Sequence, residues 1–276
     1  MRLLLTNDDG IDSVGLHVLA RAMREFGEVV IVAPDAEYSG ASSAFGALHL
    51  IQPEVHRTHI DGIDEAWMVT GPPALCVMFA TRFGVFGEPF DVIVSGINPG
   101  ANVGRSVYHS GTIGACLTGR NAGVSGVAVS QSVTDFGVEG QGWDEMLAGQ
   151  LWDTAAEVAR VVVGGLISSL PTDPVVINLN VPNAPIAELA GWQHTAVGML
   201  PPRSMASATL EPKLGHEAAF RIKMNWGDPI ELPAGTDGGA IERGLVSVSY
   251  LSRIYDADHE AARSVEGALS EVWAEM

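Results

Sequence analysis

The order of apolar and polar positions near the start of the chain predicts a strand, a helix and a second strand. Residues 2–6 (RLLLT) form an apolar run, residues 15–27 carry apolar side chains at helical spacing before a glycine, and residues 28–34 (EVVIVAP) form a second apolar run. Short apolar runs are typical of buried strands, and the 3.6-residue spacing is typical of an amphipathic helix. A strand–helix–strand unit within about thirty residues requires parallel strands.

The same alternation continues to about residue 182. The further segments that read as strands are 90–98, 125–132 and 174–182, and those that read as helices are 72–84, 112–123 and 143–169. A polar loop at 35–46 and short alternating segments up to residue 71 separate the first unit from the rest. We therefore expect a Rossmann-like α/β fold, with a mostly parallel central sheet, helices on both faces and a C-terminal hairpin or arm.

The pattern changes near residue 183. Residues 183–245 hold most of the remaining prolines and show little periodicity, which suggests a hairpin or arm. Residues 244–251 then read as a returning strand and 257–275 as a terminal helix. We expect a Rossmann-like domain at 1–182, which carries the candidate site, and a C-terminal extension at 183–276.

The charge balance narrows the set of partners. The chain carries 33 Asp and Glu against 15 Lys and Arg, a formal net charge of −18. Such a surface repels a phosphate backbone, so we expect no binding of duplex nucleic acid. A small phosphorylated substrate would also be repelled unless its site carried positive charge of its own, which a metal ion can supply.

The cysteines and the chain start suggest an ordinary cytoplasmic protein. Cys76 and Cys116 both lie in apolar surroundings and form neither a zinc pattern nor a disulfide pattern, so we interpret them as buried hydrophobic residues. The apolar stretch at the N-terminus is too short for a signal peptide, and no uncharged apolar run approaches the ~20 residues of a membrane span. We expect a cytoplasmic location and no membrane partner.

Polar residues follow three of the predicted strands. They are Asn7, Asp8, Asp9 and Gly10 after the first strand, Asp35, Ser39, Ser42 and Ser43 after the second, and Asn98, Asn102, Ser110, Gly111 and Thr112 after the strand at 90–98. In an open parallel sheet, ligands bind outside the carboxyl ends of the strands. We therefore expect these three segments to meet at one edge.

Two kinds of site are expected at this edge. The adjacent carboxylates of Asp8 and Asp9 repel each other, and hard oxygen donors suit Mg²⁺, Mn²⁺ or Ca²⁺. Ser110 to Thr112 open a helix whose free N–H groups and hydroxyls can bind an anion. A cation site beside an anion site predicts a phosphate ester held for hydrolysis. Taken singly, the acidic turn and the serine before a helix are also ordinary turn and cap chemistry.

Rival chemistries lack their motifs. The first turn (NDDGIDSVG) is not a G-x-G-x-x-G dinucleotide fingerprint, no P-loop is present, and Tyr108 replaces the second glycine of a G-x-S-x-G elbow. A receiver domain would place a phosphate-accepting Asp where Ser95 stands. We infer that no phospho-aspartate is formed. His109 is interpreted as packing beside the pocket rather than as a base.

Six segments together resemble the signature blocks of the SurE (survival protein E) nucleotidases, from residue 1 to about 251. They are LLLTNDDGIDSVGL, VAPDAEYSGAS, VTGPPALCV, VIVSGINPGANVGRSVYHSGTIGA, NLNVP and TDGGAIERGLVSVSYL. The resemblance implies a 5′-nucleotidase that hydrolyses nucleoside 5′-monophosphates, and possibly 3′-monophosphates, by metal-activated water. It also implies a homodimer or homotetramer assembled through the C-terminal extension.

The resemblance also implies roles for particular residues. One divalent ion, Mg²⁺ or Mn²⁺, is expected on Asp8, Asp9, Ser39 and Asn98. As a separate hypothesis, Asp8 or Asp9 orients or deprotonates the attacking water, and the sequence does not choose between them. The residues expected to face phosphate are Asn102, Ser110, Gly111 and Thr112. Ser43, Ala44 and Ser106 depart from the family pattern. These departures leave open an alternative, a regulatory protein that binds nucleotides without hydrolysing them.

Overall fold

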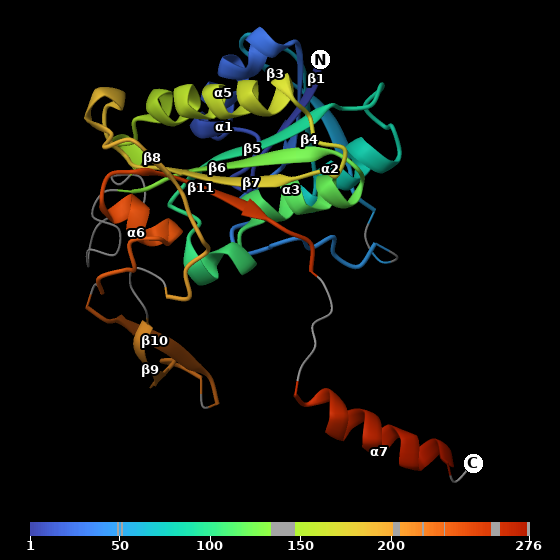
Figure 1. Ribbon diagram of the computed structural model, residues 1–276, viewed down its shortest axis with the longest axis vertical. Helices are drawn as coiled ribbons and strands as arrows, with labels where there is room; N and C mark the ends of the chain where they lie inside the picture. Colours follow the sequence, from blue (N-terminus) through green and yellow to red (C-terminus); the bar gives the residue numbers. More distant parts are fainter. Residues whose placement is uncertain are drawn as a thin grey trace.

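A nine-stranded sheet forms the centre of the computed structural model, which describes residues 1–48, 50, 52–133, 147–200, 205–216, 218–228, 230–254 and 260–274. In spatial order the strands are β3 (Val55–Ile60), β4 (Ile63–Val69), β2 (Glu28–Pro34), β1 (Arg2–Thr6), β5 (Val92–Pro99), β6 (Ser125–Gln131), β7 (Val176–Val181), β11 (Val246–Leu251) and β8 (Trp192–His194). Figure 1 shows this sheet between two layers of helices.

Most neighbouring strands run parallel. Every pair from β4 through β2, β1, β5 and β6 to β7 is parallel, whereas β3 and β11 run antiparallel to β4 and β7. The predicted α/β fold with a mostly parallel sheet is therefore confirmed. Because both faces of the sheet are covered at its centre, β1 and β2 are almost continuously apolar and buried, whereas the edge strand β3 is polar and mostly exposed.

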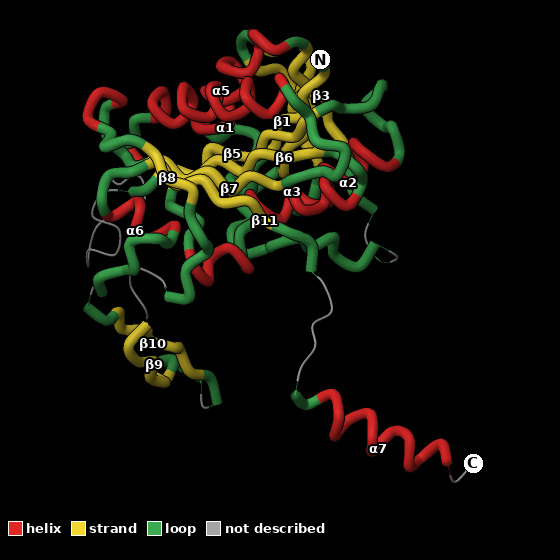
Figure 2. The backbone as a smooth tube through the Cα atoms, viewed as in Figure 1, coloured by secondary structure: helices red, strands yellow, loops and turns green. Residues whose placement is uncertain are grey.

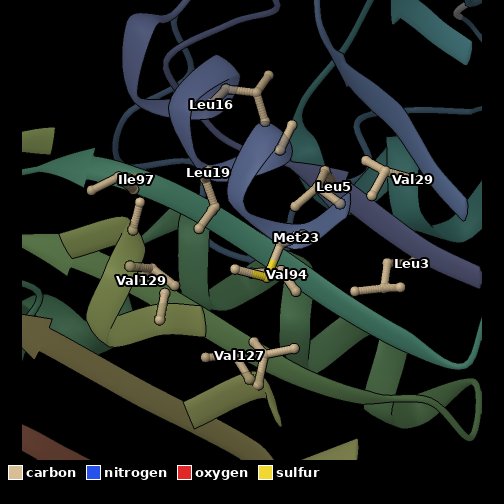
Figure 3. Close-up of a cluster of buried hydrophobic side chains, with 14 of the residues drawn as sticks. Leu3, Leu5, Leu16, Leu19, Met23, Val29, Val94, Ile97, Val127 and Val129 are labelled. Carbon is tan, nitrogen blue, oxygen red and sulfur yellow. The ribbon is translucent and has the colours of Figure 1, made fainter. Parts of the chain in front are cut away.

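Two pairs of helices cover the two faces of the sheet (Figure 1). Helices α1 (Val14–Met23) and α5 (Trp152–Ser168) lie on one face, and α2 (Pro73–Arg82) and α3 (Gly111–Asn121) lie on the other. Leu3 and Leu5 of β1 pack with Leu16 and Leu19 of α1, as Figure 3 shows, while Leu4 points into the second cluster with α2 and α3. The period of two along β1 thus supplies both halves of the core.

Some boundaries differ from the sequence prediction. The helix predicted at 143–169 is α5, which begins at Trp152, and residues 143–146 lie outside the described part of the chain. The short elements η1 (Arg24–Phe26), η2 (Gly104–Tyr108), η3 (Ile186–Glu188) and α6 (Asp237–Glu242) were not predicted as separate elements. They are too short to show a helical period. Cys76 and Cys116 are buried and free, as expected.

The C-terminal part divides between the sheet and two projecting elements. β9 (Met205–Pro212) and β10 (Phe220–Trp226) pair only with each other, as an antiparallel hairpin, among the described strands. Figure 2 shows this hairpin and α7 (Ala262–Ala274) lying apart from the sheet, whereas β8 and β11 belong to it. The sheet therefore extends past residue 183, and the domain division there stays a prediction. No described helix is long and apolar enough to span a membrane.

Candidate functional site

The two adjacent acids lie in a tight turn at the carboxyl end of β1. Asn7 Nδ2 donates a 2.9 Å hydrogen bond to the Gly10 carbonyl, which closes the turn around Asp8 and Asp9. Gly10 has φ +98°, and a Cβ there would lie 3.3 Å from the Ala36 carbonyl carbon. The glycine is thus required by both the backbone conformation and the close approach of the next loop.

The first turn of α3 packs directly against Asp8. The Thr112 hydroxyl donates a 2.6 Å hydrogen bond to Asp8 Oδ1, and the Thr112 backbone N–H also stabilises this carboxylate. A Cβ on Gly111 would lie 2.8 Å from Asp8 Oδ2, so only glycine fits there without a shift. The structure thus brings together the ends of β1 and of the segment before α3, and Asp8 lies at a helix N-terminus.

Burial and mutual repulsion leave the acidic pair poorly compensated. Burial raises the pKa of Asp8, against the opposing effect of the Thr112 hydrogen bonds. Burial, followed by the charges of Asp8 and Glu37, raises the pKa of Asp9 to about 8. Within the described residues, Asp9 Oδ2 is buried and accepts no hydrogen bond. A carboxylate in this state is suited to binding a cation.

The loop after β2 lies beside this pair and carries Ser39. The Tyr38 N–H donates to the Asp8 carbonyl at 2.7 Å, and the Ser39 N–H donates to Glu37 Oε1 at 2.7 Å. Ser39 itself is exposed, next to the residue that contacts Asp8. Glu37 was missed by the sequence reasoning, although it precedes Ser39 by two positions and its charge acts on both aspartates.

Asn98 lies at the same edge, near the end of β5. β5 and β1 are neighbours, with Ser95 opposite Thr6, and the register of β5 against β6 shifts between Ser95 and Asn98. Asn98 Nδ2 donates to the Gly100 carbonyl at 2.6 Å, which orients the amide and directs Oδ1 away from that bond. Carboxylate, hydroxyl and amide oxygens form a hard donor set, so the residues present fit Mg²⁺ or Mn²⁺.

The segment at 100–110, which we call the site loop, links β5 to α3. Ser110 is buried and caps α3 by accepting from the Ile113 N–H at 3.1 Å. The first N–H groups of a helix have no partner within it, so the start of α3 can bind an anion. The hydroxyl of Thr112 donates to Asp8 and so orients that carboxylate, while a phosphate contact of Thr112 stays a prediction.

Asn102 forms hydrogen bonds with polar side chains of β6 and β7. Its Nδ2 donates to Ser130 Oγ at 2.9 Å, and its N–H donates to Asn180 Oδ1 at 2.7 Å. Its carbonyl accepts from Asn178 Nδ2 at 2.9 Å and from Asn180 Nδ2 at 3.2 Å. This network anchors the site loop, and a phosphate contact of Asn102 stays a prediction. The sequence signal for this network is the pair Asn178 and Asn180, two amides on the same face of the strand in the segment NLNVP.

Two of the residues that depart from the family pattern, Ser43 and Ser106, donate their hydroxyls to main-chain carbonyls. Ser43 Oγ donates to the Gly114 carbonyl at 3.3 Å, and Ser106 Oγ donates to the Val103 carbonyl at 2.7 Å. Both hydroxyls therefore donate to main-chain carbonyls, and neither of these bonds is to Asp8 or Asp9. His109 is exposed, and its carbonyl accepts from the Ser42 N–H at 3.1 Å.

Comparison with known proteins agrees with the resemblance. Residues 3–202 match the family model described as Survival protein SurE. The 5′-nucleotidase SurE of Haemophilus influenzae (strain PittGG) is 34% identical over 263 residues, which cover 94% of each chain. The 5′-nucleotidase SurE of Rhodopirellula baltica is 40% identical over 185 residues, or 67% of each chain.

A solved structure extends the agreement to the fold. The crystal structure of the SurE protein from Aquifex aeolicus superposes with a TM-score of 0.74 at 25% identity, over 97% of this chain and 99% of that one. Because the superposition covers 97% of this chain, the similarity is one of the whole fold and not of a single segment. The chain belongs to the SurE family.

Proposed function

We propose that this protein is a divalent-metal-dependent 5′-nucleotidase, which hydrolyses nucleoside monophosphates to nucleoside and phosphate. The observation that carries the proposal is the buried Asp9 Oδ2, which accepts no hydrogen bond from the described residues beside a second buried carboxylate. The relatives named 5′-nucleotidase SurE support the choice of substrate. We extend the activity to 3′-monophosphates as part of the same proposal.

Four residues would hold one Mg²⁺ or Mn²⁺ ion: Asp8, Asp9, Ser39 and Asn98. When bound, such an ion offsets charge on phosphoryl oxygens and acidifies water at neutral pH. The orientation of Asn98 by Gly100, and of Asp8 by Thr112, prepares two of these side chains before any ligand arrives. Prepared donors lose less conformational entropy when they bind.

Asp9 is the better candidate for orienting and deprotonating the attacking water. Asp8 already accepts from Thr112, whereas Asp9 Oδ2 has no donor within the described residues. An oxygen with free lone pairs can accept a proton from water, and its burial strengthens that interaction. Asp8 would then serve as a fixed negative charge next to the reacting group.

The start of α3 would bind the phosphoryl group. Ser110 and Gly111 present the helix N-terminus at the edge where Asp8 lies, and the helix dipole favours negative charge there. Donors that are in place before the reaction stabilise the charge that develops on the phosphoryl oxygens. This local donor set would offset the repulsion expected from the net charge of −18.

Phosphate release tests the proposal. AMP, GMP and 3′-AMP are incubated with the wild type in Mn²⁺, in Mg²⁺ and in excess chelator, and Asp9→Asn is compared with Asp12→Asn. Asp12 is exposed in the same turn, so its variant is a matched control. We expect metal-dependent release in the wild type and the control, and a loss of about a hundredfold or more in Asp9→Asn. Nucleotide binding without release would instead support the regulatory alternative.

We also propose a homodimer or homotetramer assembled through the projecting C-terminal elements. Leu210 and Ile222 face each other across the hairpin and are 67% and 66% exposed. Val265, Leu269 and Trp273 follow one another at four-residue spacing on α7 and are also exposed. Apolar stripes of this kind are typical of surfaces covered by a partner.

Sedimentation tests this assembly. A chain ending at Leu251 lacks α7 but keeps β8 and β11 in the sheet, whereas a chain ending at Pro182 would lose both strands. We expect the chain ending at Leu251 to sediment as a smaller species than the full-length protein. If the shortened chain forms an assembly with the same number of subunits as the full-length protein, α7 is not involved in assembly. A cytoplasmic location is also proposed, and cell fractionation tests it.

A further inference from the structure

The Asp237 carboxylate is fully buried and is held by three main-chain donors. Its Oδ2 accepts from the Gly104 N–H at 2.9 Å. Its Oδ1 accepts from the Gly198 N–H at 2.9 Å and from the Gly238 N–H at 2.8 Å. Within the described part of the chain, no Lys or Arg forms an ion pair with it. Backbone donors therefore replace the lost hydration of this charge.

The bond to Gly104 reaches the start of η2 in the site loop. Within η2, the Ser106 carbonyl accepts from the His109 N–H at 2.9 Å and from the Ser110 N–H at 3.0 Å. The Ser106 N–H in turn donates to the Val103 carbonyl at 3.2 Å, so backbone hydrogen bonds tie the residues on both sides of Gly104 to Ser110, the N-cap of α3. A shift at Gly104 would be carried to Ser110 because the turn between them is hydrogen-bonded.

The bond to Gly198 reaches the segment at 196–200 that precedes the hairpin, which we call the hairpin base. A second contact joins the same two segments, since Arg105 Nε donates to the Met199 carbonyl at 2.9 Å. Gly198 is close-packed, because a Cβ there would lie 3.1 Å from Asp237 Oδ1. Asp237 thus links the site loop to the hairpin base through one side chain.

We infer that Asp237 is a positioning residue that fixes the site loop for substrate binding by joining it to the hairpin base. The inference rests on the proposed function, because the loop is taken to lead to the phosphate site. None of the contacts of Asp237 involves Asp8, Asp9, Ser39 or Asn98. Loss of the link should therefore weaken substrate binding and leave the metal ligands in place.

Two variants break the link in different ways. In Asp237→Asn one oxygen becomes an NH₂ group, which must face a backbone N–H and so loses at least one of the three bonds. In Gly198→Ala the added Cβ pushes on Oδ1 while the charge is retained. Glu242→Gln is the control for the first, since Glu242 lies in the same helix and its carboxylate accepts from the Leu232 N–H at 3.2 Å rather than from the site loop or the hairpin base. Gly235→Ala is the control for the second, because nothing lies within 4 Å of its Cβ.

Two readouts separate positioning from general stabilisation. Hydrogen–deuterium exchange of residues 100–110 should rise by about tenfold in both variants, while exchange in β1 and β5 stays at the wild-type level. The KM for AMP should rise by about five- to tenfold with kcat within about twofold, because the loop is ordered at binding and the cost is shared by ground state and transition state. The Mn²⁺ concentration for half-maximal activity should not change.

The outcomes are distinct for this inference and for the proposed function. Wild-type exchange and KM in both Asp237→Asn and Gly198→Ala would overturn the inference, as would equal changes in the two controls. If Asp237→Asn does not fold, Gly198→Ala alone decides between these results. If the wild type releases no phosphate, the proposed function fails, and the exchange measurement still decides whether Asp237 holds the loop.

Discussion

The hydroxyl of Thr112 donates a 2.6 Å hydrogen bond to Asp8 Oδ1 across 104 positions of sequence. This bond joins the end of β1 to the start of α3, and Gly111 brings the helix close enough for it to form. The acidic pair and the helix terminus are therefore one unit rather than two separate sites. A change in either residue should be felt at both.

Removing this hydrogen bond should impair catalysis more than folding. Thr112→Val keeps the shape of the side chain but leaves Asp8 without its side-chain donor, so we expect kcat to fall by about tenfold and stability to fall by about 1–2 kcal/mol. Thr112→Ser should restore most of the activity. The measurements are steady-state kinetics with AMP and unfolding in urea.

Thr118→Val is the matched control for this experiment. Thr118 is buried in the same helix, and its hydroxyl donates to the Gly114 carbonyl at 2.8 Å, away from Asp8. Its variant should keep wild-type kcat. Wild-type turnover in Thr112→Val would show that the bond does not matter for the reaction.

The metal-free protein should lose stability as the pH rises from about 4 to about 8. Burial raises the pKa of Asp9 from its ordinary value of 3.8 to about 8, so the folded state holds a proton that the unfolded state releases within this window. The stability linked to that proton is present below the lower value and is lost by the upper one. Asp9→Asn cannot lose it, and we expect its melting temperature to exceed that of the wild type by a few degrees at pH 8.5 and by less at pH 5.

Thermal melts in excess chelator at several pH values measure this difference. Other carboxylates titrate in the same range, so the informative quantity is the gap between Asp9→Asn and wild type, with exposed Asp12→Asn as the control. A gap that stays constant from pH 5 to pH 8.5 would mean that Asp9 is ordinarily ionised in the fold.

Metal binding should depend on the two neutral ligands as well as on the acids. Ser39→Ala and Asn98→Ala each remove one oxygen donor, and we expect each to weaken Mn²⁺ binding by about tenfold. Ser43→Ala serves as the control, since its hydroxyl is directed to the Gly114 carbonyl. Thermal-shift titration with Mn²⁺ gives the affinities, and equal values for Ser43→Ala and Ser39→Ala would remove Ser39 from the proposed set.

The buried amides under the site loop should support both stability and substrate binding. Asn180→Leu removes the acceptor for the Asn102 N–H and one of the two donors to the Asn102 carbonyl. Because these groups are buried, we expect the free energy of unfolding to fall by about 2–4 kcal/mol. The KM for AMP should rise because the site loop loses its anchor on β7. Urea unfolding and steady-state kinetics test this, and an unchanged KM in the folded variant would restrict Asn180 to a structural role.

Much of the fold and the acidic pair could be predicted because they depend on local patterns. Apolar runs identify the buried strands, and Asp8 and Asp9 follow one of them directly. The rule that ligands bind at the carboxyl ends of parallel strands then brings distant segments to one edge. The element boundaries were less accurate, as with α5, because caps and loops carry weaker signals.

The residues that the sequence reasoning missed act through distant partners. Asn180 lies 78 positions from Asn102, and Asp237 lies 133 positions from Gly104. A single sequence does not show which strand neighbours which, so a buried amide or carboxylate cannot be matched with its backbone donor. Glu37 was missed for another reason, because a single acid in a polar loop is usually solvated.

The proposed function depends above all on one divalent cation bound between Asp8, Asp9, Ser39 and Asn98. Anomalous diffraction from a crystal soaked in Mn²⁺ tests it most directly. We expect a single strong anomalous peak within about 2.0–2.4 Å of oxygens from these residues. A map with no peak there, and with both aspartate side chains turned toward bulk solvent, would contradict it.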